Sequence, residues 1–333
     1  MVTLSRFMAL MRSMVSTAIT PVLAAACCFG AAAQQPLTKL AETITQAATI
    51  DATAKPEVDK FIDAIDKSLG SKDPQAVKTG REMAVTMLTR QKVSNSFRTS
   101  FAALLLPRLL KVVEAQNGFT STNAIEVIEA LQCPDSIAAL ADLSSPESHE
   151  HIPTRLVAAA ALASVRTPIE LQQSQADSII KDIGANLAKE SDWMVTAYDL
   201  QALQSFSVLP QAPKQSQSTA RNLLIGSLGS IVARVRKGEA DAALMRAVHR
   251  SLAIYLRDQV PQAAPADVAA YVKGLEPTLK EIKLLAEKPP ADATDTAAFQ
   301  QAAKAADMML RSFSSSKQSG KPTTKPTTKP PAK

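Results

Sequence analysis

The 333-residue sequence predicts an all-α protein, and three observations lead to that prediction. Glycine occurs only ten times and aromatic residues make up 4% of the chain, whereas helix formers such as Ala, Leu, Gln and Lys are abundant. Few segments alternate polar and apolar residues with the period of two that strands require. Two apolar-periodic segments, residues 134–145 and 153–166, are joined by a short polar turn, which is typical of a helical hairpin.

The second helix of this hairpin, residues 153–166, is apolar on nearly every side from Leu156 to Val165. A helix that is apolar all round must be covered by other helices on several sides. We therefore expect it to lie sandwiched between neighbouring helices, with Pro134 at the first helical position of its partner.

A related pattern recurs 38 residues later. RLVAAAALASV at 155–165 aligns with WMVTAYDLQAL at 193–203. The aligned apolar positions are Val157 with Val195, Ala159 with Ala197, Leu162 with Leu200, and Val165 with Leu203. The spacing near 40 residues and the apolar second helix resemble HEAT repeats over residues 134–206. Arg155 stands where that family commonly has an arginine, but Trp193 occupies the matching place, so the repeat is degenerate. The resemblance implies an α-solenoid of antiparallel helix pairs.

Before the hairpin, residues 55–70 have the clearest amphipathic pattern, with Pro56 suited to the helix start and Gly70 to its end. Pro107 is expected to kink or divide a longer apolar run. The helices predicted here cover residues 55–70, 73–90, 94–116 and 121–132.

After the hairpin, residues 208–218 are rich in Pro, Gln and Ser and are predicted to form a hinge. Gly274 and Pro277 are expected to separate two helices. The helices predicted in this half cover residues 173–188, 191–206, 219–237, 240–257, 265–273, 277–287 and 297–313. Residues 34–313 are thus interpreted as one α-helical repeat domain.

Residues 1–33 have the features of an export signal. Arg6 and Arg12 form a positively charged start, residues 14–29 are mostly apolar, and Ala31–Ala33 fits the small-residue rule for cleavage. The sequence therefore predicts an exported protein, periplasmic or extracellular.

Two alternatives to cleavage remain open. The segment could stay as an uncleaved anchor, although Pro21 interrupts it, or Cys27 could be a lipidation site, because the residues before it resemble a bacterial lipobox with its Leu one position early. A membrane partner is expected only in those two cases. Cleavage would leave Cys133 as a single thiol, which we expect to be buried.

The tail at residues 314–333 contains no apolar residue larger than Pro or Ala and is predicted to be disordered. It repeats Lys, Pro and Thr, and Lys321, Lys325 and Lys329 could contact an anionic envelope polymer or simply keep the tail solvated. Without the seven cations of the tail and signal, 30 basic residues face 31 acidic ones. A near-neutral body argues against nucleic-acid binding.

The sequence contains few candidates for catalytic or metal chemistry. His149 and His151 flank Glu150 and are weak candidates for a metal site, because alternate residues of a turn seldom converge on one ion. Phosphate-binding and nucleophile-elbow motifs are missing from the sequence, so no catalytic residue and no cofactor is predicted.

Trp193 and Tyr198 are candidate contact residues, since large aromatics often anchor interfaces, although packing between repeats would also explain them. The leading hypothesis is an exported, non-catalytic helical scaffold that binds a protein or an anionic cell-envelope polymer. One alternative is an all-α enzyme whose site is assembled from several helices. Another is an envelope tether that acts through the basic tail.

Overall fold

A computed structural model describes residues 39–90, 92–115, 118–262, 265–290, 293 and 295–318. These residues form thirteen α-helices and one π-helix and contain no β-strand, which confirms the all-α prediction for this part of the chain. In chain order the elements are α2 (Glu42–Thr45), α3 (Lys55–Leu69), α4 (Pro74–Arg90), α5 (Asn95–Glu114), α6 (Gly118–Leu131), α7 (Pro134–Leu143), α8 (Ile152–Ala163), α9 (Gln173–Lys189), α10 (Trp193–Phe206), α11 (Lys214–Arg236), α12 (Leu244–Ile254), η1 (Tyr255–Gln259), α13 (Pro265–Glu287) and α14 (Thr296–Gln318).

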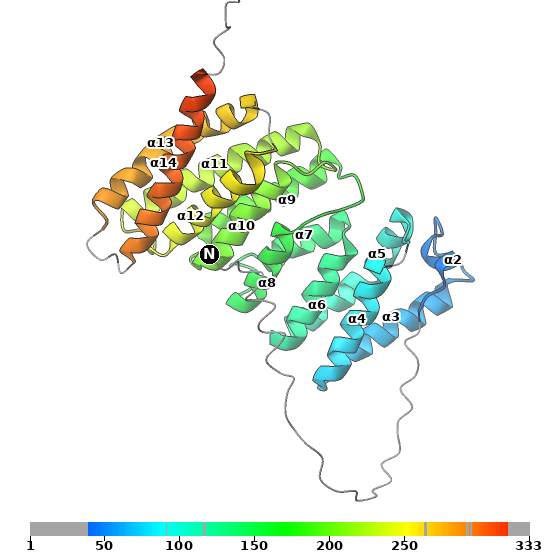
Figure 1. The fold of residues 1–333 in the computed structure, drawn as a ribbon. Coiled ribbons are helices and arrows are strands. Elements are labelled where there is room, and N and C mark those ends of the chain that lie inside the picture. The colour runs from blue at the N-terminus through cyan, green and yellow to red at the C-terminus, as the bar shows by residue number, and fades with distance from the viewer. Residues whose placement is uncertain are drawn as a thin grey trace, which may run out of the picture. The chain divides into compact units, whose positions relative to one another are not determined.

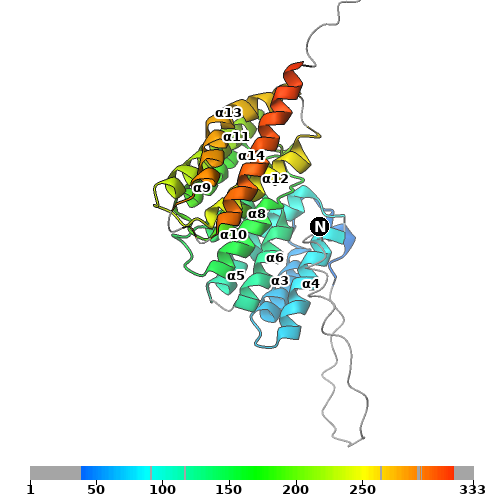
Figure 2. The same ribbon diagram turned by 60° about the vertical axis from the view of Figure 1, so that its left-hand side comes forward.

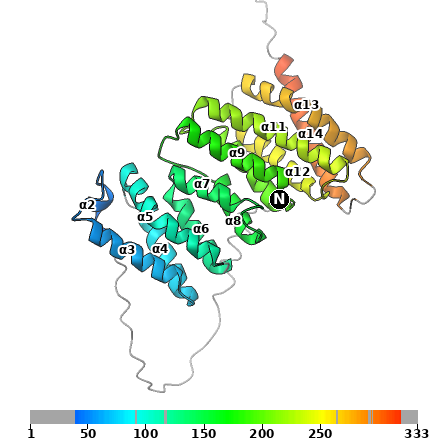
Figure 3. The same cartoon turned by 180° about the vertical axis from the view of Figure 1, so that it is seen from behind.

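The helix contacts from α3 to α14 follow two rows (Figures 1 and 3). Each odd-numbered helix from α3 to α13 packs against the next odd-numbered helix, and each even-numbered helix from α4 to α14 packs against the next even-numbered one. Each odd-numbered helix from α3 to α13 also packs across the rows on the even-numbered helix that follows it, from α3 on α4 to α13 on α14. Figure 2 shows α8, α10, α12 and α14 of the even row with α9, α11 and α13 beside them.

The apolar helix α8 is covered as expected. It packs against α6, α7 and α10, and Ala159 and Leu162 are fully buried. Ala197 and Leu200, their counterparts in α10, are fully buried too. Cys133 is a buried free thiol directly before α7, and Pro134 takes the predicted first position of that helix.

One predicted helix boundary is wrong, because α13 continues through Gly274 and Pro277 as one helix. Helix α5 is not divided at Pro107 either, in keeping with the predicted range of residues 94–116. Both prolines are exposed, so the carbonyl that each leaves without its helical hydrogen bond can bond to water. The buried stripes continue past both prolines, with Leu105 and Leu109 in α5, and with Tyr271, Val272, Leu275, Leu279 and Ile282 in α13. Packing of these stripes outweighs the local preference to end the helix.

Other ends differ from the prediction by a few residues. Helix α6 begins at Gly118, three residues before the predicted start at residue 121. Helix α14 extends to Gln318, five residues into the segment predicted as tail. The tail lysines Lys321, Lys325 and Lys329, and the predicted signal at residues 1–33, lie outside the described residues.

The stretch interpreted as a hinge, residues 208–218, contains the start of α11 at Lys214. The Gln217 amide nitrogen donates to the carbonyl oxygens of Leu209 (2.8 Å) and Ala212 (3.0 Å). The turn before α11 is thereby attached to the first turn of the helix.

No helix among the described residues has both the length and the apolar character that a membrane span requires.

Gly80 allows α3 and α4 to approach each other closely. A Cβ atom at this position would lie 2.8 Å from Cβ of Ser68 and 3.2 Å from the carbonyl oxygen of Ile65. Gly226 in α11 is different, because a Cβ there would meet no atom within 4 Å.

Gly80→Ala is expected to lower the free energy of unfolding by about 1–3 kcal/mol, because the added methyl overpacks the contact of α3 with α4. Gly226→Ala is the matched control and should raise the free energy of unfolding by about 0.5–1 kcal/mol, since Ala restricts the unfolded chain. Urea unfolding of both variants measures the difference. A gain of stability in Gly80→Ala would contradict the close approach.

Candidate functional site

The turn between α7 and α8 contains both histidines that the sequence indicated as weak metal candidates. His151 precedes α8, and its Nδ1 lies 3.0 Å from the hydroxyl of Thr154. The backbone carbonyl of His149 accepts a hydrogen bond from Arg155. No group of three His, Cys, Asp or Glu side chains that could hold a metal ion occurs among the described residues.

Arg155, in the first turn of α8, is the centre of a buried polar network. Its Nε donates to Glu190 Oε2 at 2.8 Å and its Nη2 donates to Glu190 Oε1 at 3.1 Å. Its Nη1 donates to the carbonyl oxygens of His149 (2.9 Å) and Glu150 (2.8 Å). Both side chains of the ion pair are almost completely buried. The Glu190 carboxylate thus balances the charge of the guanidinium, and the two backbone carbonyls before α8 accept the hydrogen bonds of its Nη1.

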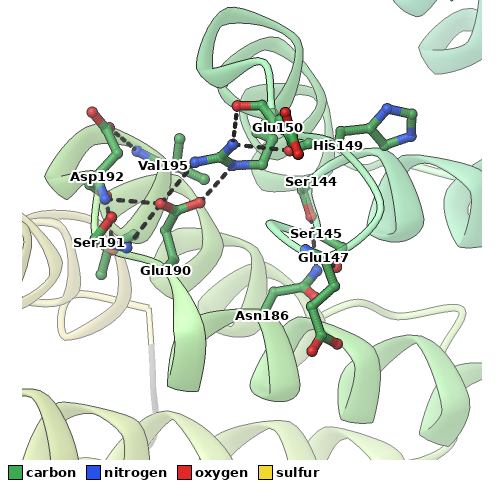
Figure 4. A network of polar contacts seen from close by, with 12 residues as sticks. Ser144, Ser145, Glu147, His149, Glu150, Asn186, Glu190, Ser191, Asp192 and Val195 are labelled. Carbon is green, nitrogen blue, oxygen red and sulfur yellow. Dashed lines mark hydrogen bonds and ion pairs between the residues drawn. The ribbon is translucent and has the colours of Figure 1, made fainter. Parts of the chain in front are cut away.

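Glu190 connects this network to the next turn (Figure 4). Its Oε1 accepts from the backbone nitrogens of Ser191 (2.9 Å) and Asp192 (2.8 Å), directly before α10. Asp192 then caps α10, since its Oδ1 accepts from the backbone nitrogens of Met194 and Val195. The turn before α8 and the turn before α10 are therefore held by one ion pair.

The Arg155–Glu190 pair was not predicted as a pair, although the sequence contained a signal for it. Arg155 begins a helix that is otherwise apolar, and a buried arginine requires an anionic partner. The position of that partner, 35 residues away, depends on how the two hairpins stack. Because the pair makes its bonds to backbone and is closed to solvent, we interpret it as structural.

Asp199 in α10 is completely buried beside this network, and neither of its carboxyl oxygens has a hydrogen-bond partner within the described residues. Burial raises the pKa of Asp199 well above its usual range, and the neighbouring Glu190 carboxylate raises it further, while Arg155 and Ser144 oppose the shift. The buried site therefore favours the neutral, protonated form of the side chain, because a charge there would be very costly.

Trp193 and Tyr198, the two predicted contact residues, lie on α10 where it packs against α12. The guanidinium of Arg246 lies 5.5 Å from the ring centroid of Trp193, and that of Arg250 lies 4.3 Å from the ring centroid of Tyr198. Both aromatic side chains are partly exposed. We call Trp193, Tyr198, Arg246 and Arg250 the arginine–aromatic face.

The two arginines of this face were not predicted from the sequence. Their spacing of four residues places them on one side of α12, which is a recognisable pattern, but nothing in it indicates which helix they face. Arg246 also pairs with Asp295, whereas Arg250 has no ion pair among the described residues.

No protein-family model matches the chain, and no curated protein matches it. One solved structure, described as "Computational Design of Self-Assembling Cyclic Protein Homooligomers", aligns with 79% of this chain and 96% of its own chain. Its sequence identity is 15% and its TM-score is 0.21, which is too low to support any statement about fold or function.

Glu190→Ala should lower the free energy of unfolding by about 3–5 kcal/mol, because it leaves the Arg155 guanidinium buried without a counter-charge. The control is the adjacent Lys189→Ala, which removes a pair with Glu147 in which both side chains are at least half exposed. That change should cost about 1 kcal/mol or less. Chemical denaturation distinguishes the two, and equal small losses would contradict the structural role of the buried pair.

Asp199→Asn should raise the free energy of unfolding at neutral pH and reduce its decline with pH. In the unfolded chain Asp199 loses its proton near pH 4, whereas the folded protein keeps it to a much higher pH. Between the two pKa values the folded state binds more protons, so stability falls as pH rises. Denaturation curves from pH 4 to pH 8 measure this slope, and an unchanged slope in the variant would contradict the raised pKa.

Proposed function

We propose that this chain is an exported, non-catalytic α-solenoid of HEAT-like antiparallel helix pairs that binds a protein of the cell envelope through the arginine–aromatic face. The observation that carries the proposal is the pair of cation–π contacts that join α10 and α12 at a solvent-accessible surface. Trp, Tyr and Arg are the residues that most often dominate binding energy at protein interfaces.

Two features favour the solenoid. Helices pack within an odd row and an even row, with consecutive helices paired across them, so each pair mainly meets the pairs before and after it. The 38-residue match of α8 with α10 joins neighbours in the even row, and its central positions are buried in both helices. Stacked pairs present long rows of equivalent surface, which repeat proteins use for binding.

Three properties of the face favour a protein partner. The arginines are held over the rings, so less side-chain freedom is lost on binding than for mobile surface cations. Nearly half of the Arg246 side chain remains exposed, and the neighbouring Met194 adds exposed apolar area. The mixture of aromatic, apolar and cationic groups suits a protein surface with acidic and apolar residues better than a polymer of repeated anionic units.

Export is part of the proposal because of the sequence of residues 1–33, and the basic tail would then add a weak attraction to anionic envelope polymer. An enzyme assembled from several helices is the less favoured reading. Neither the buried ion pair nor the arginine–aromatic face combines a nucleophile with a base that could activate it.

A photo-crosslinking amino acid at Met194 should form a discrete adduct with a partner protein in the envelope of producing cells. Arg250→Ala and Trp193→Ala should each weaken that adduct strongly, because truncation of an interface anchor commonly costs at least about 2 kcal/mol, or roughly 30-fold in affinity. Thermal unfolding of each variant establishes that the fold is kept.

The matched control places the same crosslinker at Asp182, which is exposed on α9 in the other row. Adducts of equal yield at both positions, or an unchanged Met194 adduct in the folded Arg250→Ala variant, would contradict binding through this face.

A further inference from the structure

A polar cavity of about 540 Å³ lies between α10, α11, η1 and α13, apart from the arginine–aromatic face. Its volume falls within the range of small-molecule sites, roughly 300–1,000 Å³. Its wall is rich in glutamine and tyrosine and includes Gln201, Gln204, Arg221, Asp258, Gln259 and Tyr271.

Two glutamines of α10, Gln201 and Gln204, belong to this wall. Gln204 is 1% exposed, and its amide nitrogen donates to the carbonyl oxygen and to the hydroxyl of Ser251, both at 2.9 Å. The carbonyl of Ser251 can only accept, so the orientation of the Gln204 amide is fixed. Its Oε1 atom, like that of Gln201 one turn earlier, is closed to solvent and has no hydrogen-bond partner within the described residues.

Tyr271 adds a hydroxyl to the same wall. The side chain is 2% exposed, and its ring stacks on Tyr255 with 3.9 Å between the centroids. Burial raises the pKa of both phenols, that of Tyr255 to about 12, so each remains a protonated donor. The Tyr271 hydroxyl has no hydrogen-bond partner among the described residues, although Gln204 lies near enough to oppose the rise in its pKa.

The π-helix η1 positions the opposite wall. The backbone nitrogen of Val260 donates to the carbonyl of Tyr255 at 3.0 Å, across five residues, which widens the turn. Three residues of this turn line the cavity, namely Tyr255, Asp258 and Gln259. The side-chain nitrogen of Gln259 donates to the backbone carbonyl oxygen of Gln204 at 3.2 Å. Single turns of π-helix are rare and occur frequently at functional sites.

The charged groups of the wall balance. The wall carries two cations, Lys214 and Arg221, and two carboxylates, Asp258 and Asp267. Arg221 lies 3.8 Å from Asp267, and Asp258 pairs with Arg257. Because neither sign is in excess, the cavity favours neither an anion nor a cation. An apolar ligand would leave the buried amide oxygens and the phenol unpaired, which is costly.

We propose that this cavity binds an uncharged polyhydroxylated ligand of the size of a mono- or disaccharide. The Gln201 and Gln204 oxygens and the Tyr271 hydroxyl lie just beneath the wall and are closed to solvent. A sugar that reaches them donates hydroxyl protons to the oxygens and accepts from the Tyr271 hydroxyl, so closely spaced hydroxyls satisfy both kinds of group. This site goes beyond the proposed protein interface and does not depend on it.

Isothermal titration calorimetry of the purified chain tests the site with N-acetylglucosamine and maltose, and with glucosamine and glucuronate as charged counterparts. We expect saturable binding of at least one neutral sugar at millimolar concentration or below, and weaker binding of the charged sugars. Absence of binding by both neutral sugars, or a preference for a charged one, would overturn the proposal.

Tyr271→Phe and Gln201→Leu should each weaken binding of that sugar by about threefold to tenfold, the loss of one hydrogen bond. Tyr271→Phe should leave the melting temperature of the free protein unchanged or higher, because the removed hydroxyl has no partner in it. Unchanged affinity in both folded variants would overturn the assignment. Arg250→Ala, which does not line the cavity, should keep sugar binding and lose only the protein adduct, so the two proposals can fail separately.

Discussion

The burial of the Arg155 charge is the constraint on which the middle of the structure depends. Its guanidinium can be removed from water only if a carboxylate and several acceptors meet it, and Glu190 and the carbonyls of the α7–α8 turn supply them. Glu190 in turn bonds to the backbone where α10 begins. One helix pair is therefore held at a fixed register on the next, and a slip of either hairpin would leave a buried charge unpaired, at a cost of several kcal/mol.

Helix α10 transmits this constraint to both candidate binding sites. Its start is positioned by Glu190 and capped by Asp192. Its apolar side packs on α8 in the core, while its first turns present Trp193 and Tyr198 to α12 and its later turns carry the glutamines of the cavity. A helix that is held at one end by an ion pair and along one side by the core offers its remaining side chains in a defined geometry, which lowers the entropic cost of binding.

The sequence alone predicted a helix correctly where a local pattern determines it. The amphipathic period predicted α3, and Pro134 and the apolar run at residues 156–165 predicted α7 and α8. It failed at Gly274 and Pro277, where the outcome depends on which side of a helix faces solvent. A proline is expected to end a helix, but Pro277 is exposed, so packing carries α13 past it. The sequence also could not show which residues meet across different helix pairs. Trp193 and Tyr198 were therefore predicted without the arginines that lie over them, and Arg155 without its partner Glu190.

The buried polar groups differ in how they can lower the cost of burial. Arg155 does so through complete pairing, and the raised pKa of Asp199 lets that side chain avoid the cost of a buried charge. Gln204 and Tyr271 have no such route, because an amide oxygen does not titrate in this range and the phenol is already neutral. An unpaired buried acceptor or donor costs about 1–3 kcal/mol, a substantial fraction of the stability of a domain. Where such atoms cluster in one cavity, the cost is recovered when a ligand brings hydroxyl groups to them, which is why the unpaired atoms argue for binding more strongly than the cavity volume does.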